Sequence, residues 1–160
     1  MSAPAWLPPL LTLGECQGDW HAYIGRVYEV FRRDFVQRSP IFRGRPVHIK
    51  RRPTEQGRER GFWHVTSAGK REAQRLPDIR RCERIRWLRA IIEHADDAAV
   101  KVWENERHGK PRTVLWAEEA EFLLVLEARK DAWVLWTAYP VTEQRRKRSL
   151  QREYEQSRKS

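Results

Sequence analysis

The spacing of apolar residues changes along the chain, and this change divides it into predicted helices and strands. From Asp19 to about Val36 the apolar residues recur at helical spacing, and Asp19 is a residue type that caps helix N-termini. We interpret this apolar stripe as a core-facing surface, formed by Trp20, Ile24, Val27, Phe31 and Phe35.

In the second half, apolar runs of strand length follow one another closely. Their connections are short, which requires antiparallel pairing, so we predict a four-stranded meander. The predicted strands are Ala99–Asn105, Arg112–Glu118, Glu121–Ala128 and Ala132–Tyr139.

The last of these strands is apolar on both faces until Thr137 and Tyr139, a pattern typical of a central strand whose far end opens onto a site. Pro140 cannot donate a ladder hydrogen bond, so the strand is expected to end there. In an extended chain Thr137 and Tyr139 point to the same face.

The patterns between the helix and the meander are shorter. Val47 and Ile49 alternate with polar residues and predict a short strand, and Phe62–Ser67 predicts a second one with Phe62, His64 and Thr66 on one face. The segment Arg51–Gly61 between them is rich in arginine and almost without apolar side chains, so we predict a mobile basic loop that touches phosphate.

Two further helices are predicted from capping residues. Asp78 is suited to cap a short arginine-rich helix that reaches Arg86, while Trp87–Ala95 fits either a continued helix or a buried connection. Thr142 is suited to cap a mostly solvated, basic final helix to about Tyr154.

Together these elements predict one α+β domain spanning residues 1–160. The N-terminal helix and the short helix would pack on a twisted antiparallel β-sheet, with residues 1–18 irregular and residues 142–160 forming a basic C-terminal helix or tail.

Charge narrows the choice of partner. The 160 residues carry 32 Lys and Arg against 22 Asp and Glu, a net charge of +10, so a polyanion is expected and nucleic acid is the first candidate. A ribosomal surface, or an acidic antitoxin or immunity protein, would match the same charge. Two cysteines favour a reducing compartment, and no apolar run is long enough to cross a bilayer, so a cytoplasmic location is expected without membrane association.

The chemistry follows partly by elimination. The histidines lie far apart, no cysteine or carboxylate spacing matches a metal site, and no glycine-rich phosphate loop is present, so we expect no metal and no cofactor. A histidine, a compact group of arginines and two hydroxyls suit metal-independent cleavage of RNA. That reaction needs an acid, a base and fixed cations for the charge that grows on phosphorus.

We therefore assign His64 as general base or acid, Arg81 and Arg84 as phosphate clamps, and Thr137 with Tyr139 as orienting hydroxyls. Structural roles compete with each assignment. His64 can be a satisfied structural histidine, the arginines can pair with neighbouring acids, and the hydroxyls can bond to backbone. Further nucleic-acid contacts are assigned to Arg51, Arg52, Arg58, Arg60, Thr66, Arg86, Lys101, Asn105, Arg145 and Arg146.

The order of elements, ending in Leu135–Pro140, resembles the superfold shared by barnase, EndoU, colicin and RelE-like (BECR) ribonucleases. The run Phe62–Ser67, followed by Pro77-Asp78 and the arginine-rich segment to Trp87, is similar to phage-associated members of that group. The resemblance covers roughly Asp19 to Tyr139. It implies a metal-independent ribonuclease of toxin or mobile-element type with His64, Thr137 and Tyr139 in the cleft, although no second catalytic histidine is evident.

A different class of function stays open. The same charges fit a module of phage or mobile-element origin that binds RNA, DNA or protein without cutting. A transcription regulator would need a recognition helix, for which the arginine-rich helix around Arg84 is the candidate.

Overall fold

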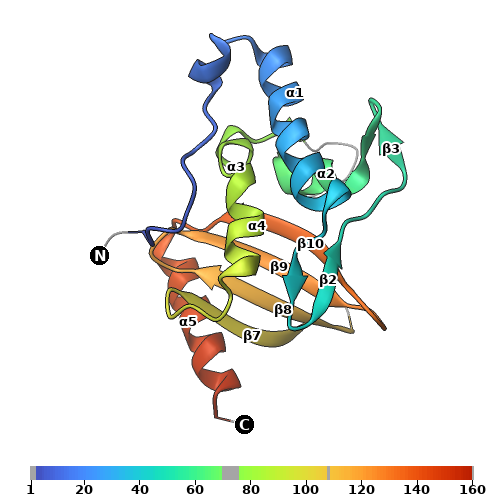
Figure 1. Ribbon diagram of the computed structural model, residues 1–160. Coiled ribbons are helices and arrows are strands. Elements are labelled where there is room, and N and C mark those ends of the chain that lie inside the picture. The colour runs from blue at the N-terminus through green and yellow to red at the C-terminus, as the bar shows by residue number, and fades with distance from the viewer. Residues whose placement is uncertain (1–2, 70–75, 108, 160) are drawn as a thin grey trace.

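A computed structural model describes residues 3–69, 76–107 and 109–159 (Figure 1). Its helices and helical turns are η1 (Leu13–Cys16), α1 (Trp20–Phe31), the π-helical η2 (Arg32–Gln37), α2 (Arg60–Thr66), α3 (Ile79–Glu83), α4 (Ile85–Glu93) and α5 (Gln144–Ser157). Its strands are β1 (Ile41–Phe42), β2 (Arg45–His48), β3 (Thr54–Glu55), β4 (Arg58–Glu59), β5 (Ser67–Ala68), β6 (Leu76–Pro77), β7 (Val100–Arg107), β8 (Lys110–Ala117), β9 (Phe122–Ala128) and β10 (Trp133–Pro140). In the described part of the chain, no helix has the length and apolar character that a membrane crossing requires.

The predicted α+β class is confirmed, but the main sheet is mixed rather than antiparallel throughout. Its strand order is β1-β2-β10-β9-β8-β7. Neighbours from β7 to β10 pair antiparallel, whereas β2 pairs parallel with β10. The physical reason is the connectivity: the helices after β2 lead to β7 at the far edge of the sheet, and three antiparallel reversals from β7 to β10 then place β10 beside β2 in the same direction.

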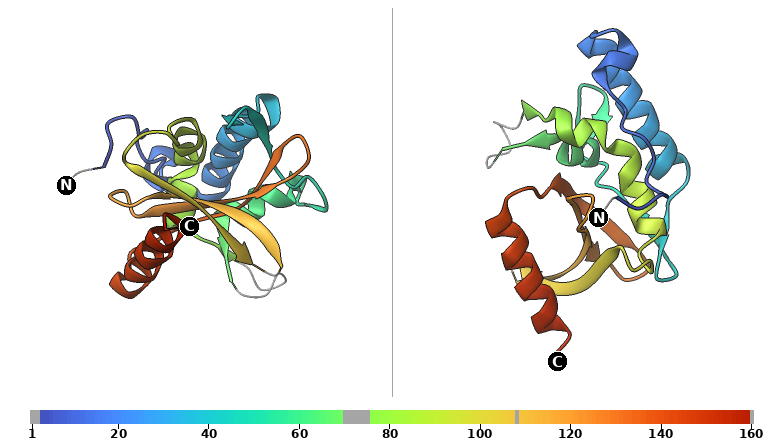
Figure 2. Two further views of the ribbon diagram at one scale, coloured as in Figure 1. Left: turned by 90° about the horizontal axis from the view of Figure 1, so that it is seen from below. Right: turned by 90° about the vertical axis from the view of Figure 1, so that its left-hand side faces the viewer.

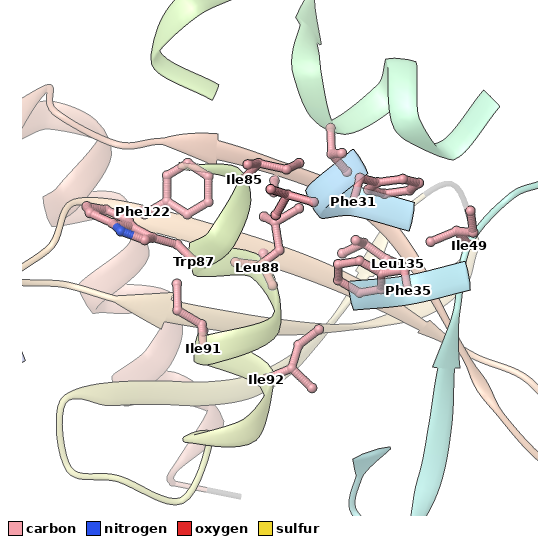
Figure 3. Packing of buried hydrophobic residues seen from close by; sticks show 14 of the residues in the cluster. Phe31, Phe35, Ile49, Ile85, Trp87, Leu88, Ile91, Ile92, Phe122 and Leu135 are labelled. Carbon is pink, nitrogen blue, oxygen red and sulfur yellow. The ribbon is translucent and has the colours of Figure 1, made fainter. Parts of the chain in front are cut away.

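One face of the sheet packs against α1, η2 and α4, and this contact forms the larger core (Figure 3). The helical stripe predicted from Asp19 onward is buried from Ile24 to Phe35, while Trp20 remains 40% exposed. Asp19 accepts the amide hydrogen of Ala22, as predicted for an N-cap. The segment after Trp87 is helical, and α4 contributes Leu88, Ile91 and Ile92 to the same core.

Helix α5 covers part of the opposite face, so the curled sheet lies between α5 and the other helices (Figure 2). Leu150 of α5 is buried against Trp103 and Trp116 of the sheet. The helix begins at Gln144, and its N-cap residue is Glu143, one residue after the predicted cap at Thr142. Because both faces are covered, β8 and β9 are buried along most of their length.

The segment Phe62–Ser67 was predicted as a strand, but Phe62–Thr66 belongs to helix α2 and Ser67 begins strand β5. Phe62, Val65 and Thr66 are buried at i, i+3 and i+4, which is a helical pattern that six residues are too few to distinguish from alternation. The hydroxyl of Thr66 is fully buried and donates to the carbonyl oxygen of Phe62 at 2.8 Å. The predicted contact of Thr66 with nucleic acid does not fit this burial.

The predicted mobile loop Arg51–Gly61 contains a short hairpin instead. Strands β3 and β4 pair with Thr54 opposite Glu59 and Glu55 opposite Arg58, which leaves a two-residue turn at Gln56-Gly57. Both turn residues have positive φ, 52° and 74°, the conformation of a type I′ hairpin turn. The glycine was visible in the sequence, but the strands beside it have no apolar alternation to reveal them.

From residue 3 to residue 18 the N-terminal segment contains the helical turn η1 and is otherwise irregular, and it packs against the helices. Leu11 is buried, its amide nitrogen donates to the carbonyl oxygen of Glu83 at 2.9 Å, and its own carbonyl accepts from the Tyr23 hydroxyl at 2.8 Å. Nearer the N-terminus, the carbonyl oxygen of Pro8 accepts a hydrogen bond from the indole of Trp87. These bonds attach the segment to α1, α3 and α4.

The Tyr23 bond gives a stability prediction. Tyr23→Phe leaves the Leu11 carbonyl without its donor, so the free energy of unfolding should fall by about 1–3 kcal/mol at neutral pH. Burial raises the pKa of Tyr23, which favours the neutral phenol in the folded state. Its contribution is therefore fully present below about pH 10 and is lost as pH rises toward the raised pKa.

Urea denaturation at pH 7 and above pH 10 measures both effects, since Tyr23→Phe should also lose part of the alkaline destabilisation. Tyr154→Phe is the matched control, because the Tyr154 hydroxyl accepts an exposed bond from Arg158. Equal stability of wild type and Tyr23→Phe would contradict the prediction.

Candidate functional site

Charged side chains interrupt the apolar sheet on the face that carries α5. Arg112 of β8 pairs directly with Glu127 of β9, and Glu127 pairs with Val134 of β10. Residues paired in this way lie on the same face of a sheet. Thr137 and Tyr139, which pair with Val125 and Leu123, share this face as predicted.

A β-bulge in β10 determines where Trp136 lies. Leu135 pairs with Leu126 and Thr137 pairs with Val125, so Trp136 is an extra residue without a partner in the register. Such a bulge bends the strand and redirects a side chain. The ring of Trp136 is half-buried beside the charged pair, with the Arg112 guanidinium carbon 4.0 Å from its centroid.

The pair of Arg112 and Glu127 is almost fully buried, with side-chain exposures of 4% and 3% and 3.2 Å between Nη2 and Oε2. Glu127 also contacts Lys110 at 3.9 Å between Nζ and Oε1, and it bonds to Arg129. Three cations therefore share this carboxylate. The Nε of Arg112 makes no hydrogen bond to any residue that the structure describes. This excess of positive charge favours binding of an anion.

Lys50 adds a further cation at the same place. Its Nζ lies 3.2 Å from the Trp136 ring centroid, because β2 runs parallel to β10 and ends two residues before Lys50. Gly61 brings the start of α2 close to Lys50. Its amide donates to the Lys50 carbonyl at 2.7 Å, and a Cβ on residue 61 would lie 3.0 Å from Lys50 backbone atoms, so the approach needs glycine.

The surroundings of Lys50 disfavour its charge. Burial lowers the pKa of its ammonium group, and the nearby charges of Arg60, Arg112 and Arg129 lower it further, against an opposing effect of Glu127. A bound phosphate would act in the opposite direction to the nearby cations, since an anion stabilises the ammonium form.

The structure brings four of the predicted catalytic residues to this cluster. The His64 ring, on α2, lies 6.2 Å from the Trp136 ring centroid, and α2 packs on β10. The Arg81 guanidinium, on α3, lies 5.7 Å from the Tyr139 ring, and its Nη1 lies 3.4 Å from the His64 carbonyl oxygen. Thr137 follows Trp136 on the same face. We call these four residues together with Lys50, Arg112 and Trp136 the Trp136 cluster.

The remaining predicted clamp, Arg84, is engaged elsewhere. It lies between α3 and α4, where its Nη1 donates to the Arg80 carbonyl at 2.9 Å and its guanidinium carbon lies 5.1 Å from the Trp87 ring. Its nearest recorded carboxylate is that of Glu83, at 3.7 Å. The assignment of Arg84 to the same site as Arg81 does not fit these contacts.

The predicted nucleic-acid contacts fall into three groups. Arg146 donates to the Tyr139 hydroxyl at 3.1 Å, and the charge of Arg60 lowers the pKa of Lys50, so both residues border the Trp136 cluster. By contrast, Lys101 and Asn105 bond to side chains of α5, at Gln151 and Glu153, and we do not carry them into the site. The structure leaves four others exposed or half-buried, namely Arg51, Arg52, Arg86 and Arg145.

Sequence reasoning missed Lys50, Arg112, Glu127 and Trp136. A signal for two of them was present. Arg112 is the first residue of the buried, mostly apolar part of β8, and Glu127 is the last residue of the buried, otherwise apolar part of β9. A charge in such a strand has to be compensated inside the fold, which marks it as a candidate for a paired or functional group.

Over residues 3–69, 76–107 and 109–159, no three His, Cys, Asp or Glu side chains gather as metal ligands would. Comparison with models of protein families, with curated proteins and with solved structures finds no match to this chain. Functional assignment therefore rests on the geometry of the Trp136 cluster.

The buried pair gives a second stability prediction. Glu127→Gln removes the counter-charge of Arg112, so the free energy of unfolding should fall by about 3–5 kcal/mol. The double change Arg112→Met with Glu127→Leu removes both charges and should cost less than Glu127→Gln alone. Urea denaturation measures all three proteins.

Glu119→Gln is the matched control, because Glu119 is exposed in the turn between β8 and β9. Its expected effect is within about 0.5 kcal/mol. A wild-type unfolding midpoint for Glu127→Gln would show that the buried charge of Arg112 is compensated by other groups.

Proposed function

We propose that this protein is a metal-independent ribonuclease of toxin or mobile-element type, acting in the cytoplasm and related in fold to the barnase, EndoU, colicin and RelE-like group. One observation supports this most strongly. His64, which was chosen from the sequence for this chemistry, lies near the ring of Trp136, which Lys50 and Arg112 also contact. Arg81 lies against Tyr139 of the same strand.

In the proposed reaction, the RNA 2′-oxygen attacks the adjacent phosphorus, the bond from phosphorus to the 5′-oxygen breaks, and a cyclic phosphate remains. A base takes the proton of the 2′-hydroxyl and an acid protonates the departing 5′-oxygen. Arg81 and Arg112 provide fixed positive charge for the phosphorane, while the hydroxyls of Thr137 and Tyr139 orient its oxygens.

The two proton-transfer roles fall to His64 and Lys50 in this proposal. Because an imidazole can both accept and donate a proton, His64 suits either role. The lowered pKa of Lys50 makes its ammonium group a better proton donor than an ordinary lysine, so Lys50 supplies the second group that the sequence left unidentified.

His64→Ala should lower the rate of RNA cleavage by about 10²–10⁴-fold, because it removes a proton-transfer group, while RNA affinity changes little. The assay incubates purified protein with total RNA in EDTA and sequences the fragment ends. Discrete cuts with cyclic-phosphate ends are expected. The control is His94→Ala, which removes a histidine stacked on Trp6 at the end of α4.

The assay also separates cleavage from binding alone. Loss of wild-type cleavage in EDTA would contradict the metal-independent mechanism. Intact RNA together with salt-sensitive binding would instead assign the protein as a binding module.

Lys50→Arg tests the second proton-transfer role. Arginine keeps the positive charge but its pKa, above about 12, prevents proton donation, so kcat should fall while RNA affinity stays within a few fold. Lys50→Met removes the charge too and should weaken both. Single-turnover kinetics measure the rate of the cleavage step. A wild-type rate in Lys50→Arg would limit Lys50 to an electrostatic role.

A further inference from the structure

A pocket of about 660 Å³ lies beside α2, outside the Trp136 cluster. Its walls come from the start of α1, the β3–β4 hairpin and α2, which lie next to one another at the top of the molecule in Figure 1. A volume of this size is typical of sites for small organic ligands. The residues that matter for its chemistry are Trp20, His21, Glu55, Arg58, Arg60 and Trp63.

Two indole rings form walls of this pocket. Trp20 is 40% exposed, and its ring leans on Tyr23 with 5.6 Å between centroids. Trp63 is fixed more firmly, because its Nε1 donates to the Glu55 carbonyl at 2.9 Å and its ring meets Phe62 edge-on. A large exposed apolar ring beside a second, fixed ring is a surface suited to stacking a planar ligand.

The charge of the pocket favours an anionic ligand. Arg58 and Arg60 line it, and Glu55 is the one carboxylate among its described lining residues. The Arg58 guanidinium carbon lies 5.2 Å from the Tyr28 ring and 5.9 Å from the Trp63 ring, so aromatic contacts hold this cation in place. Planar stacking surfaces together with guanidinium groups match a nucleobase with its phosphate.

Helix α2 connects the pocket to the Trp136 cluster. Trp63 lines the pocket, and the next residue, His64, lies near Trp136. Arg60 lines the pocket and its charge also acts on Lys50. A strand of RNA bound at the cluster therefore has a base-sized pocket within reach of its neighbouring nucleotide.

We propose that this pocket binds one nucleotide, with its base against Trp20 and Trp63 and its phosphate at Arg58 and Arg60. That the nucleotide belongs to the RNA substrate rests on the proposed function. A free nucleoside monophosphate has the same chemistry, and the experiment distinguishes the two sources.

The test measures, by calorimetry on the full chain, the affinity for the four nucleoside 5′-monophosphates and for a 2′-O-methyl hexanucleotide that cannot be cleaved. Stacking contributes about 1–3 kcal/mol per base, so Trp20→Ala should weaken binding by about 5- to 150-fold. Trp20→Phe should restore part of the affinity. Ile41→Ala is the matched control, because Ile41 is 56% exposed on β1, outside both sites.

Loss of affinity for the hexanucleotide in Trp20→Ala, with monophosphates bound far more weakly than the hexanucleotide, supports an RNA nucleotide in the pocket. Monophosphate binding as tight as that of the hexanucleotide, and equally lost in Trp20→Ala, supports a free nucleotide instead. Unchanged affinities in Trp20→Ala, or binding of neither ligand by the wild type, would overturn the pocket proposal.

Cleavage kinetics separate this inference from the proposed function. In Trp20→Ala the KM for RNA should rise by a similar factor while kcat is retained, because the pocket binds but does not react. If the wild type cleaves RNA and Trp20→Ala has the same KM as the wild type, the pocket proposal is overturned while the ribonuclease proposal stands. Nucleotide binding that depends on Trp20 without any cleavage supports the pocket and contradicts the ribonuclease.

Discussion

The buried pair of Arg112 and Glu127 is the constraint on which the candidate site depends. Strands β8 and β9 are covered on both faces, so a charge within them loses most of its hydration. Each charge is tolerated because the other lies directly across the strand pair. This pairing fixes the Arg112 guanidinium beside Trp136, where a flexible surface arginine would sample many positions.

Two backbone features assemble the rest of the Trp136 cluster around that pair. The bulge in β10 places Trp136 beside Arg112, and the parallel pairing of β2 with β10 brings Lys50 to the same ring. The close approach of Gly61 to Lys50 then positions α2, which carries His64 toward the sheet. Loss of any one of these local geometries would move a cation or the imidazole away from the others.

Elements with a long apolar pattern or a clear capping residue were predicted correctly from the sequence, and short segments were not. The helix after Asp19 and the cap at Asp78 are confirmed, because capping residues and a repeated apolar stripe act within a few residues of the chain. The short segments Phe62–Thr66 and Arg51–Gly61 were assigned wrongly. In the first, tertiary burial selected helix over strand, and in the second, the turn geometry of Gln56-Gly57 formed a hairpin without apolar alternation.

The sequence by itself determined the α+β class, the strong positive charge and the common face of Thr137 and Tyr139, because composition and a period of two residues need no tertiary contact. Tertiary structure alone decided that Lys50, His64 and Arg112 lie around Trp136 and that Arg81 lies against Tyr139. These residues come from separate elements, and their proximity results from a parallel strand pairing, a bulge and the packing of α2 on β10. Such long-range contacts are set by burial of the whole core, which no local pattern records.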